Sequence, residues 1–133
     1  MMKIKRVGSA IPAQDIKRAR EFWEQKLGFK PVDESPDGGA FYTVGDTGFF
    51  VFPSTGKASG THTQMALDVD DVEEAVKELK RRGVELEEYD MPNFKTVDGL
   101  IVLPDGSRGG WFKDTEGNLI AIGTLIPAGA RSS

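Results

Sequence analysis

The sequence predicts an α+β fold built from two β-α-β-rich modules, because one pattern occurs twice along the chain. In each copy an aspartate precedes apolar residues at helical spacing, and a glycine follows them. The first copy runs from Asp15 to Gly28 and carries Ile16, Ala19, Phe22, Trp23 and Leu27. The second runs from Asp71 to Gly83 and carries Val72, Ala75, Val76 and Leu79. Strand-like runs flank both copies, so the repeat restricts the fold more than composition does.

The length and composition predict one compact domain over 1–133. We expect it to contain two modules, at about 1–56 and 57–126, followed by a frayed tail at 127–133. Hydrophobic residues make up 38% of the chain, enough for a core. The sequence has no long apolar run and no apolar segment after the basic N-terminus, which predicts neither a membrane partner nor a secretory signal. The absence of cysteine excludes disulfides and thiolate catalysis. We therefore expect a cytoplasmic protein.

The first module is expected to begin with a strand over residues 3–11. Asp15 is a suitable N-cap for the helix that follows, and Gly28 suits its left-handed end. A turn cluster at 33–39 precedes a predicted hairpin of strands 40–44 and 48–52. The Ser-, Thr- and Gly-rich stretch 53–61 is predicted to link the modules.

The second module is expected to begin with a strand at 62–69. Asp71 followed by Glu74 resembles a capping box at the start of the second helix. Strands are then predicted at 84–89, 100–103, 109–113 and 118–125, separated in part by Gly-containing turns. The stretch 91–99 is interpreted as a surface loop that could act as a lid.

These segments resemble the vicinal oxygen chelate superfamily, which includes glyoxalase I, bleomycin-resistance proteins and extradiol dioxygenases. The resemblance rests on residues 15–29, on 69–84 and on 112–120, the last reading Phe-Lys-Asp-Thr-Glu-Gly-Asn-Leu-Ile. The resemblance depends on the order and spacing of these segments more than on any single motif, and it extends over nearly the whole chain. The resemblance implies paired βαβββ modules whose curved mixed sheet forms a cup for a small molecule. It also implies a homodimer, in which modules of both chains often complete each cup.

Metal-dependent members of that superfamily hold one divalent ion with His, Gln or Glu from four strands. Carried over by position, the ligands fall at about Gly8, at Gln64, at Ala121 and within 49–52. No Asp or Glu occurs between Asp46 and Asp68, so a shift of register cannot supply that carboxylate. Of the expected ligands only Gln64 remains, and it is neutral and weak. Ala121 cannot act as the carboxylate base of glyoxalase chemistry. We therefore expect no metal and no cofactor.

Strand alternation predicts one bulky and one small face in several strands. Val7 and Ile11 should oppose Gly8 and Ala10, and Ile120 and Ile122 should oppose Ala121. Small residues on a concave sheet leave volume for a ligand. The alternative is that aromatic side chains fill this volume as ordinary core. The candidates for that role are Phe41, Phe50, Phe52 and Trp111.

The candidate ligand-binding residues are Gly8, Phe50, Phe52, His62, Gln64, Trp111 and Ala121. His62 could be a general base, but it has no acidic neighbour in sequence and is more readily interpreted as an exposed or hydrogen-bonding residue. Gln64 is expected to orient a ligand, and Phe22 and Trp23 to be core. Interspersed charges, with a net charge of −4, do not predict nucleic-acid binding.

Two functions follow. The first is a metal-independent protein that, like bleomycin-resistance proteins, sequesters an apolar or planar organic compound. The alternative is a glyoxalase- or dioxygenase-like enzyme, with no catalytic residue assigned, acting on a small organic substrate.

Overall fold

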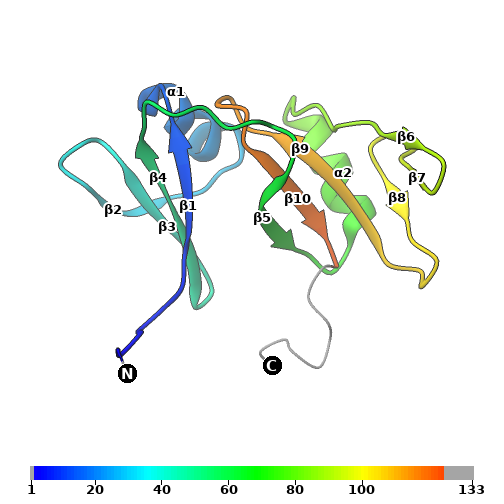
Figure 1. Ribbon diagram of the computed structural model, residues 1–133, viewed down its shortest axis with the longest axis horizontal. Coiled ribbons are helices and arrows are strands. Elements are labelled where there is room, and N and C mark those ends of the chain that lie inside the picture. Colours follow the sequence, from blue (N-terminus) through cyan, green and yellow to red (C-terminus); the bar gives the residue numbers. More distant parts are fainter. Residues whose placement is uncertain (1, 125–133) are drawn as a thin grey trace. The chain divides into compact units, whose positions relative to one another are not determined.

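A computed structural model describes residues 2–124 (Figure 1). The described chain divides into two compact units. Unit 1 contains residues 2–59 together with 114–118, and unit 2 contains 60–113 together with 119–124. The predicted tail 127–133 and the end of the last predicted strand at Leu125 lie outside the described residues. One domain over 1–133 stays a prediction, which a single cooperative unfolding transition would support.

Unit 1 is a βαβββ module. It consists of β1 (Ser9–Ala13), α1 (Ile16–Glu21), a π-helical continuation η1 (Phe22–Lys26), β2 (Pro31–Glu34), β3 (Ala40–Val44) and β4 (Thr47–Pro53). The sheet order is β1-β4-β3-β2, with β1 parallel to β4 and the other pairs antiparallel. The helical segment covers one face of this sheet (Figure 1).

The core of unit 1 forms between this helical segment and the sheet, with Trp23 at its centre. The Trp23 side chain is fully buried, and its ring lies 5.0 Å from that of Phe49. Phe49 in turn stacks on Tyr42 at 5.0 Å. Phe22 is also buried, so the prediction that both helix aromatics are core is confirmed.

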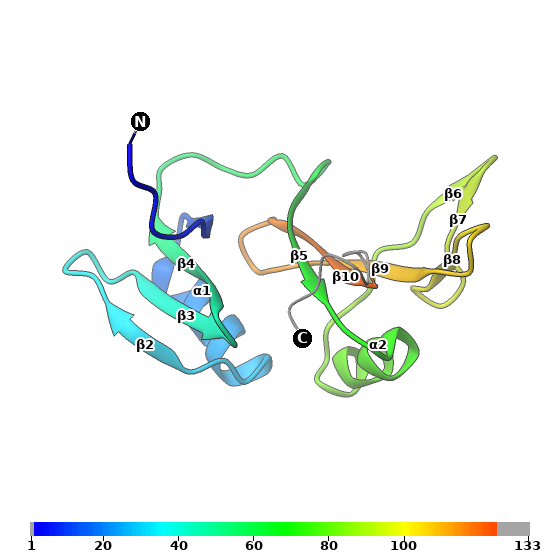
Figure 2. The same ribbon diagram turned by 90° about the horizontal axis from the view of Figure 1, so that it is seen from below.

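Unit 2 repeats the topology with added short strands. It contains β5 (Thr63–Asp68), α2 (Val72–Arg81), β6 (Asp90–Met91), β7 (Phe94–Lys95), β8 (Ile101–Val102), β9 (Arg108–Lys113) and β10 (Leu119–Gly123). Its main sheet has the order β5-β10-β9-β8, with β5 parallel to β10. Figure 2 shows α2 on one face of this sheet and the β6–β7 hairpin near β8. The predicted α+β fold of two βαβββ modules with mixed sheets is confirmed.

The predicted caps are present in both helices. The Asp15 carboxylate accepts a hydrogen bond from the Arg18 amide at 3.0 Å, and that of Asp71 accepts from the Glu74 amide at 3.0 Å. Gly28 and Gly83 adopt positive φ values of 85° and 80°, where a side chain would be strained. The capping box is only half formed, since the Glu74 carboxylate pairs with Arg81 instead.

Several predicted boundaries were wrong. The first strand begins at Ser9 rather than residue 3, so Val7 is 88% exposed and is not a core partner of Ile11. Residues 84–89 do not form a strand, because only Leu86 makes an isolated bridge, to Phe112. The stretch 91–99 is more than a loop, since it contributes to the β6–β7 hairpin. In each case sequence propensity does not show whether a strand finds a pairing partner.

Candidate functional site

The face of the unit 1 sheet turned away from its helix carries three phenylalanines. In β4, Phe49 and Val51 are buried, whereas Phe50 and Phe52 alternate with them and remain partly exposed. The Phe50 ring lies 5.4 Å from that of Phe41 and 5.9 Å from that of Phe52. Unit 1 therefore presents an aromatic strip on its open face.

Small residues of β1 lie beside this strip. Ala10 pairs with Phe50, and Pro12 pairs with Phe52. Gly8 is exposed just before β1, and its alternation places it on the side of Ala10. A methyl group added at Gly8 would lie 3.5 Å from the Gly48 carbonyl oxygen, an ordinary contact. Gly8 thus lies at the end of the open face rather than at its centre.

The corresponding face of unit 2 is dominated by Trp111. Its partner across the strands is Ala121, which in turn pairs with Ala66. The Trp111 indole Nε1 donates to Thr63 Oγ1 at 3.2 Å, so the ring reaches from β9 across β10 to β5. Ala121 is only 4% exposed, while Ala66 is exposed. The packing alternative is therefore correct in part, because Trp111 occupies some of the volume above Ala121.

Two further aromatic rings extend the Trp111 surface. Tyr89 lies edge-on to Trp111 at 5.6 Å, and Phe94 of β7 lies 5.2 Å from it. All three side chains are partly exposed. Burial and the Glu87 carboxylate raise the pKa of the Tyr89 hydroxyl further above physiological pH. Strand alternation alone does not orient Tyr89, and the sequence analysis did not assign Phe94 to the site, since only the hairpin brings Phe94 to Trp111.

Gln64 lies at an irregularity of β5. Thr63 pairs with Leu119 and Met65 pairs with Ile120, so Gln64 has no pairing partner of its own in β10. Its side-chain Oε1 is buried, and within residues 2–124 no hydrogen-bond donor reaches it. His62 is exposed in the bend just before β5. In unit 2 the structure therefore places Trp111 opposite Ala121 and leaves Gln64 at the irregularity of β5, with His62 exposed just before that strand.

The expected metal positions do not fit a divalent ion. Gly8 and Ala121 carry no donor atom, and the side chains of 49–52 are all apolar. Residues 2–124 contain no group of three or more His, Asp or Glu side chains close enough to share an ion. Gln64 alone cannot supply the charge and geometry that such sites need. No catalytic step is therefore assigned to a metal.

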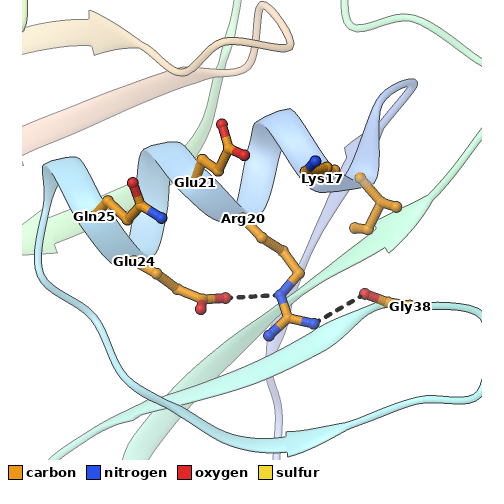
Figure 3. Close-up of a pocket in the computed structure, with 7 residues that line it drawn as sticks. Lys17, Arg20, Glu21, Glu24, Gln25 and Gly38 are labelled. Atoms are coloured by element: carbon orange, nitrogen blue, oxygen red, sulfur yellow. Dashed lines mark hydrogen bonds and ion pairs between the residues drawn. The ribbon is translucent and has the colours of Figure 1, made fainter.

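A separate hollow of about 300 Å³ lies on unit 1 beside α1 and η1. Figure 3 shows Arg20 there, between Glu24 and the Gly38 carbonyl. Arg20 donates to Glu24 at 2.7 Å and to Glu34 at 3.3 Å, and Tyr42 donates to Glu24 at 2.7 Å. Burial and the Glu24 carboxylate raise the pKa of Tyr42. These polar groups satisfy one another, which favours a role in holding the helix to the strands.

A buried polar turn also belongs to unit 1. The Asp114 carboxylate accepts from the Trp23 indole at 3.3 Å, from the Asn118 side chain at 2.8 Å, and from the amides of Glu116 and Asn118 at 2.9 Å each. Burial raises the pKa of Asp114 despite these bonds. Sequence reasoning identified only a turn here. The only sequence signal was the polar run 114–118 itself; its contact with Trp23, whose indole needs an acceptor, is decided by the tertiary fold.

Glu116 anchors the same turn to the start of α1. Burial alone would raise its pKa, but hydrogen bonds from the Arg18 guanidinium and the Asp15 amide bring it below its ordinary value. The turn is therefore structural: the Asp114 and Glu116 carboxylates and Asn118 Nδ2 have protein partners, and the buried Asn118 Oδ1 has none within 2–124.

Comparison with known proteins identifies the fold family. The profile described as Glyoxalase/Bleomycin resistance protein/Dioxygenase superfamily matches residues 3–122. No curated protein sequence matches the chain. Among solved structures, an antibiotic-binding protein, TnmS3 from Streptomyces sp. CB03234, is similar with a TM-score of 0.65 and 22% identity, over 92% of this chain and 98% of that one.

Two further structures show the same fold. A bleomycin-binding protein solved with bleomycin has a TM-score of 0.68 and 18% identity, over 92% of this chain and 100% of that chain. A glyoxalase family protein from Enterococcus faecalis has a TM-score of 0.66 and 22% identity, over 91% and 96% respectively. No helix within 2–124 has the length and apolar character to cross a membrane. The chain therefore belongs to the glyoxalase/bleomycin resistance protein/dioxygenase superfamily.

Proposed function

We propose that this protein binds an apolar or planar organic molecule without a metal and sequesters it. One protein of similar fold is an antibiotic-binding protein, which supports the binding of a small molecule. The proposed contacts are the sequence-predicted residues, taken for each unit by itself: Gly8, Phe50 and Phe52 on unit 1, and His62, Gln64, Trp111 and Ala121 on unit 2. Phe41, Tyr89 and Phe94 are added because their rings contact members of that set.

The observation that carries the proposal is the aromatic surface on the open face of each sheet. Partly exposed rings keep apolar area in contact with water unless a ligand covers it. Covering such area contributes about 25 cal/mol per Å², and stacked or edge-on ring pairs add about 0.5–1.5 kcal/mol each. The poor metal donor set supports binding over metal-dependent catalysis.

A compound screen with a matched pair of variants tests the proposal. Planar aromatic compounds should raise the melting temperature and change tryptophan fluorescence. Ala66→Leu adds bulk to the open face of β5 at an exposed position and should weaken binding with little loss of stability. Lys77→Leu, exposed on α2, which lies on the other face of the unit 2 sheet, is the control and should bind as the parent does. If Ala66→Leu binds every hit as tightly as the parent, the open face of unit 2 is not the site.

Metal independence has its own test. Elemental analysis of untagged protein should find no stoichiometric transition metal, and Zn²⁺, Ni²⁺, Mn²⁺ or Fe²⁺ should leave the melting temperature unchanged. One ion held per chain through Gln64 or His62 would refute this and favour the enzyme reading. A homodimer remains part of the proposal, because closed two-fold assemblies are common among small proteins. Light scattering should then give about twice the chain mass of 14.5 kDa, and a monomer would contradict it.

A further inference from the structure

Trp111 lies on the open face of the unit 2 sheet, where two neighbouring rings contact it. A methyl group added at Gly110 would lie 3.6 Å from a Val76 methyl carbon of α2, so Gly110 is on the helix-covered face. Because strand side chains alternate, the adjacent Trp111 is on the other face. Its indole contacts the rings of Tyr89 and Phe94, and all three rings remain partly exposed. The open face therefore carries an aromatic cluster formed by β9 and the hairpin segment.

The aromatic cluster is closed in this structure. The ring centroids of Trp111 and Phe94 lie 5.2 Å apart, and those of Tyr89 and Phe94 lie 5.7 Å apart. These are contact distances for aromatic pairs. A flat ring stacked between two others needs its neighbours about 7 Å apart, since each stacked contact is about 3.5 Å. A planar molecule therefore enters between Trp111 and Phe94 only if Phe94 moves outward by about 2 Å.

The base of the β6–β7 hairpin is held firmly. Thr96 is buried, its amide donates to the Tyr89 carbonyl at 2.9 Å, and its hydroxyl oxygen accepts from the Tyr89 amide at 2.8 Å. The Gly99 amide donates to the Glu88 carboxylate at 2.5 Å. A side chain at Gly99 would clash, because an added methyl carbon would lie 2.5 Å from the Leu86 Cβ. These contacts fix the point at which the hairpin joins the unit.

The tip of the hairpin is attached more weakly. Its two strands pair at two positions, Asp90 with Lys95 and Met91 with Phe94. Within the described part of the chain, residues 91–95 make their hydrogen bonds inside the hairpin, and the Phe94 ring connects the tip with the sheet. Short, exposed ladders of this kind open at a low cost in free energy. The hairpin thus combines a fixed base with a tip that an aromatic contact holds down.

We propose that the β6–β7 hairpin is a lid: Phe94 lifts from Trp111, a planar aromatic molecule enters, and Phe94 closes on its outer side. The ligand is then held between two rings, in a slot one ring thick. Phe94 thereby becomes a specificity-determining residue that selects flat compounds over puckered ones. The Trp111–Phe94 contact has to break before a ligand enters, so the lid slows both binding and release. This inference rests on the proposed function and deepens it.

The binding kinetics of Phe94→Ala test the lid. Temperature-jump relaxation, followed by tryptophan fluorescence at several concentrations of 2-naphthol, gives the association and dissociation rate constants. Both should rise about two- to tenfold in Phe94→Ala, the range that one aromatic contact is worth. The dissociation constant should change less than about threefold, because the variant loses one ring contact with the ligand but no longer has to break the contact with Trp111.

A matched pair of compounds tests the slot. 2-Naphthol and cis-decahydro-2-naphthol share a bicyclic carbon skeleton and one hydroxyl group, but only 2-naphthol is flat. The parent protein should bind 2-naphthol about tenfold more tightly, since two ring contacts depend on flatness. In Phe94→Ala this preference should fall to about threefold, mainly because the puckered compound binds more tightly. Equilibrium dialysis measures both affinities.

Two control variants separate the lid from its surroundings. Val102→Ala removes an exposed apolar side chain from the nearby strand β8 and should leave both rate constants unchanged. Phe94→Tyr keeps the ring and should behave as the parent does. If Phe94→Ala does not unfold cooperatively, Phe94→Leu, which has no ring, carries the same expectations.

The outcomes distinguish the lid from the proposed function. Unchanged rate constants in folded Phe94→Ala overturn the lid and leave the proposed function intact. A change in affinity that comes from the dissociation rate alone does the same, because it describes a fixed contact that does not have to open. Failure of the parent to bind either compound overturns both the lid and the proposed function.

Discussion

The two units share one plan and differ in how their helices are built. Each begins with an Asp-capped helix, ends that helix at a glycine with positive φ, and pairs its first strand in parallel with another strand. In unit 2 the helix is regular over ten residues. In unit 1 the α-helix gives way after six residues to a π-helical segment of five.

The helix difference coincides with one residue. Eight positions after its cap, unit 1 has Trp23 where unit 2 has Leu79. Both are buried, but only the indole also needs a hydrogen-bond acceptor, which Asp114 provides. The wider π turn accompanies a larger side chain with a polar atom. The two copies thus share their helix caps and parallel strand pairing, while the buried side chains of the two helices pack differently.

The open faces differ as well. In unit 1 the aromatic rings come from adjacent strands of one hairpin. In unit 2 one ring comes from the sheet, and Tyr89 and Phe94 come from the segment between α2 and β8. Unit 1 therefore has a face fixed by regular strand pairing, whereas the face of unit 2 depends in part on the hairpin of the two-residue strands β6 and β7.

The largest expected effect is a difference in unfolding free energy between the alanine variants of Trp23 and Trp111. Trp23→Ala should cost about 3–5 kcal/mol of unfolding free energy, because it leaves a large cavity and removes one of the hydrogen bonds that the buried Asp114 carboxylate accepts. Trp111→Ala removes a partly exposed ring and should cost about 1 kcal/mol, while abolishing ligand binding. Urea denaturation with a ligand titration measures both. Equal losses of stability would show that Trp111 is core and that the open face of unit 2 is not a binding surface.

A smaller loss of stability is expected from a substitution in the buried turn 114–118, which belongs to unit 1. Asp114→Asn places an NH₂ group where both carboxylate oxygens now accept hydrogen bonds. We expect a loss of about 1–3 kcal/mol, although the substitution also removes a buried charge. Asp105→Asn, in an exposed turn of unit 2, is the matched control and should have a much smaller effect. Equal melting temperatures for Asp114→Asn and the parent would contradict a structural role for the turn.

The smallest effect is a pH dependence carried by Glu116. Its pKa is lowered in the folded state, so its stabilising contribution is complete above the ordinary glutamate value of about 4.3. The contribution is lost as the pH falls through the lowered pKa. The stability difference between the parent and Glu116→Gln should therefore be constant near neutral pH and shrink in acid. Burial raises the pKa of Asp114, so its effect on stability has the opposite pH dependence: that contribution is lost as the pH rises through the raised pKa. A difference that grows in acid would contradict the Arg18–Glu116 assignment.

The sequence by itself determined the repeat, the helices with their caps, and the central strands. These depend on neighbours along the chain: an Asp three residues before an amide, a glycine at a left-handed position, and apolar residues at fixed spacing. The same local logic predicted that Ile120 and Ile122 of the last strand lie opposite Ala121. It also predicted the lack of metal donors, because donor atoms are a property of residue type.

Only the tertiary structure decided which surfaces are open and which are filled. Ala66 and Ala121 look alike in sequence and are paired in space, yet Trp111 lies opposite Ala121 alone and only Ala66 stays exposed. Likewise, nothing near Gln64 in sequence shows that its oxygen is buried without a donor, or that Asp114 accepts from Trp23, which lies 91 residues away along the chain. Such contacts depend on how the strands pair and which side chains reach across them, and strand pairing is a long-range property of the folded chain.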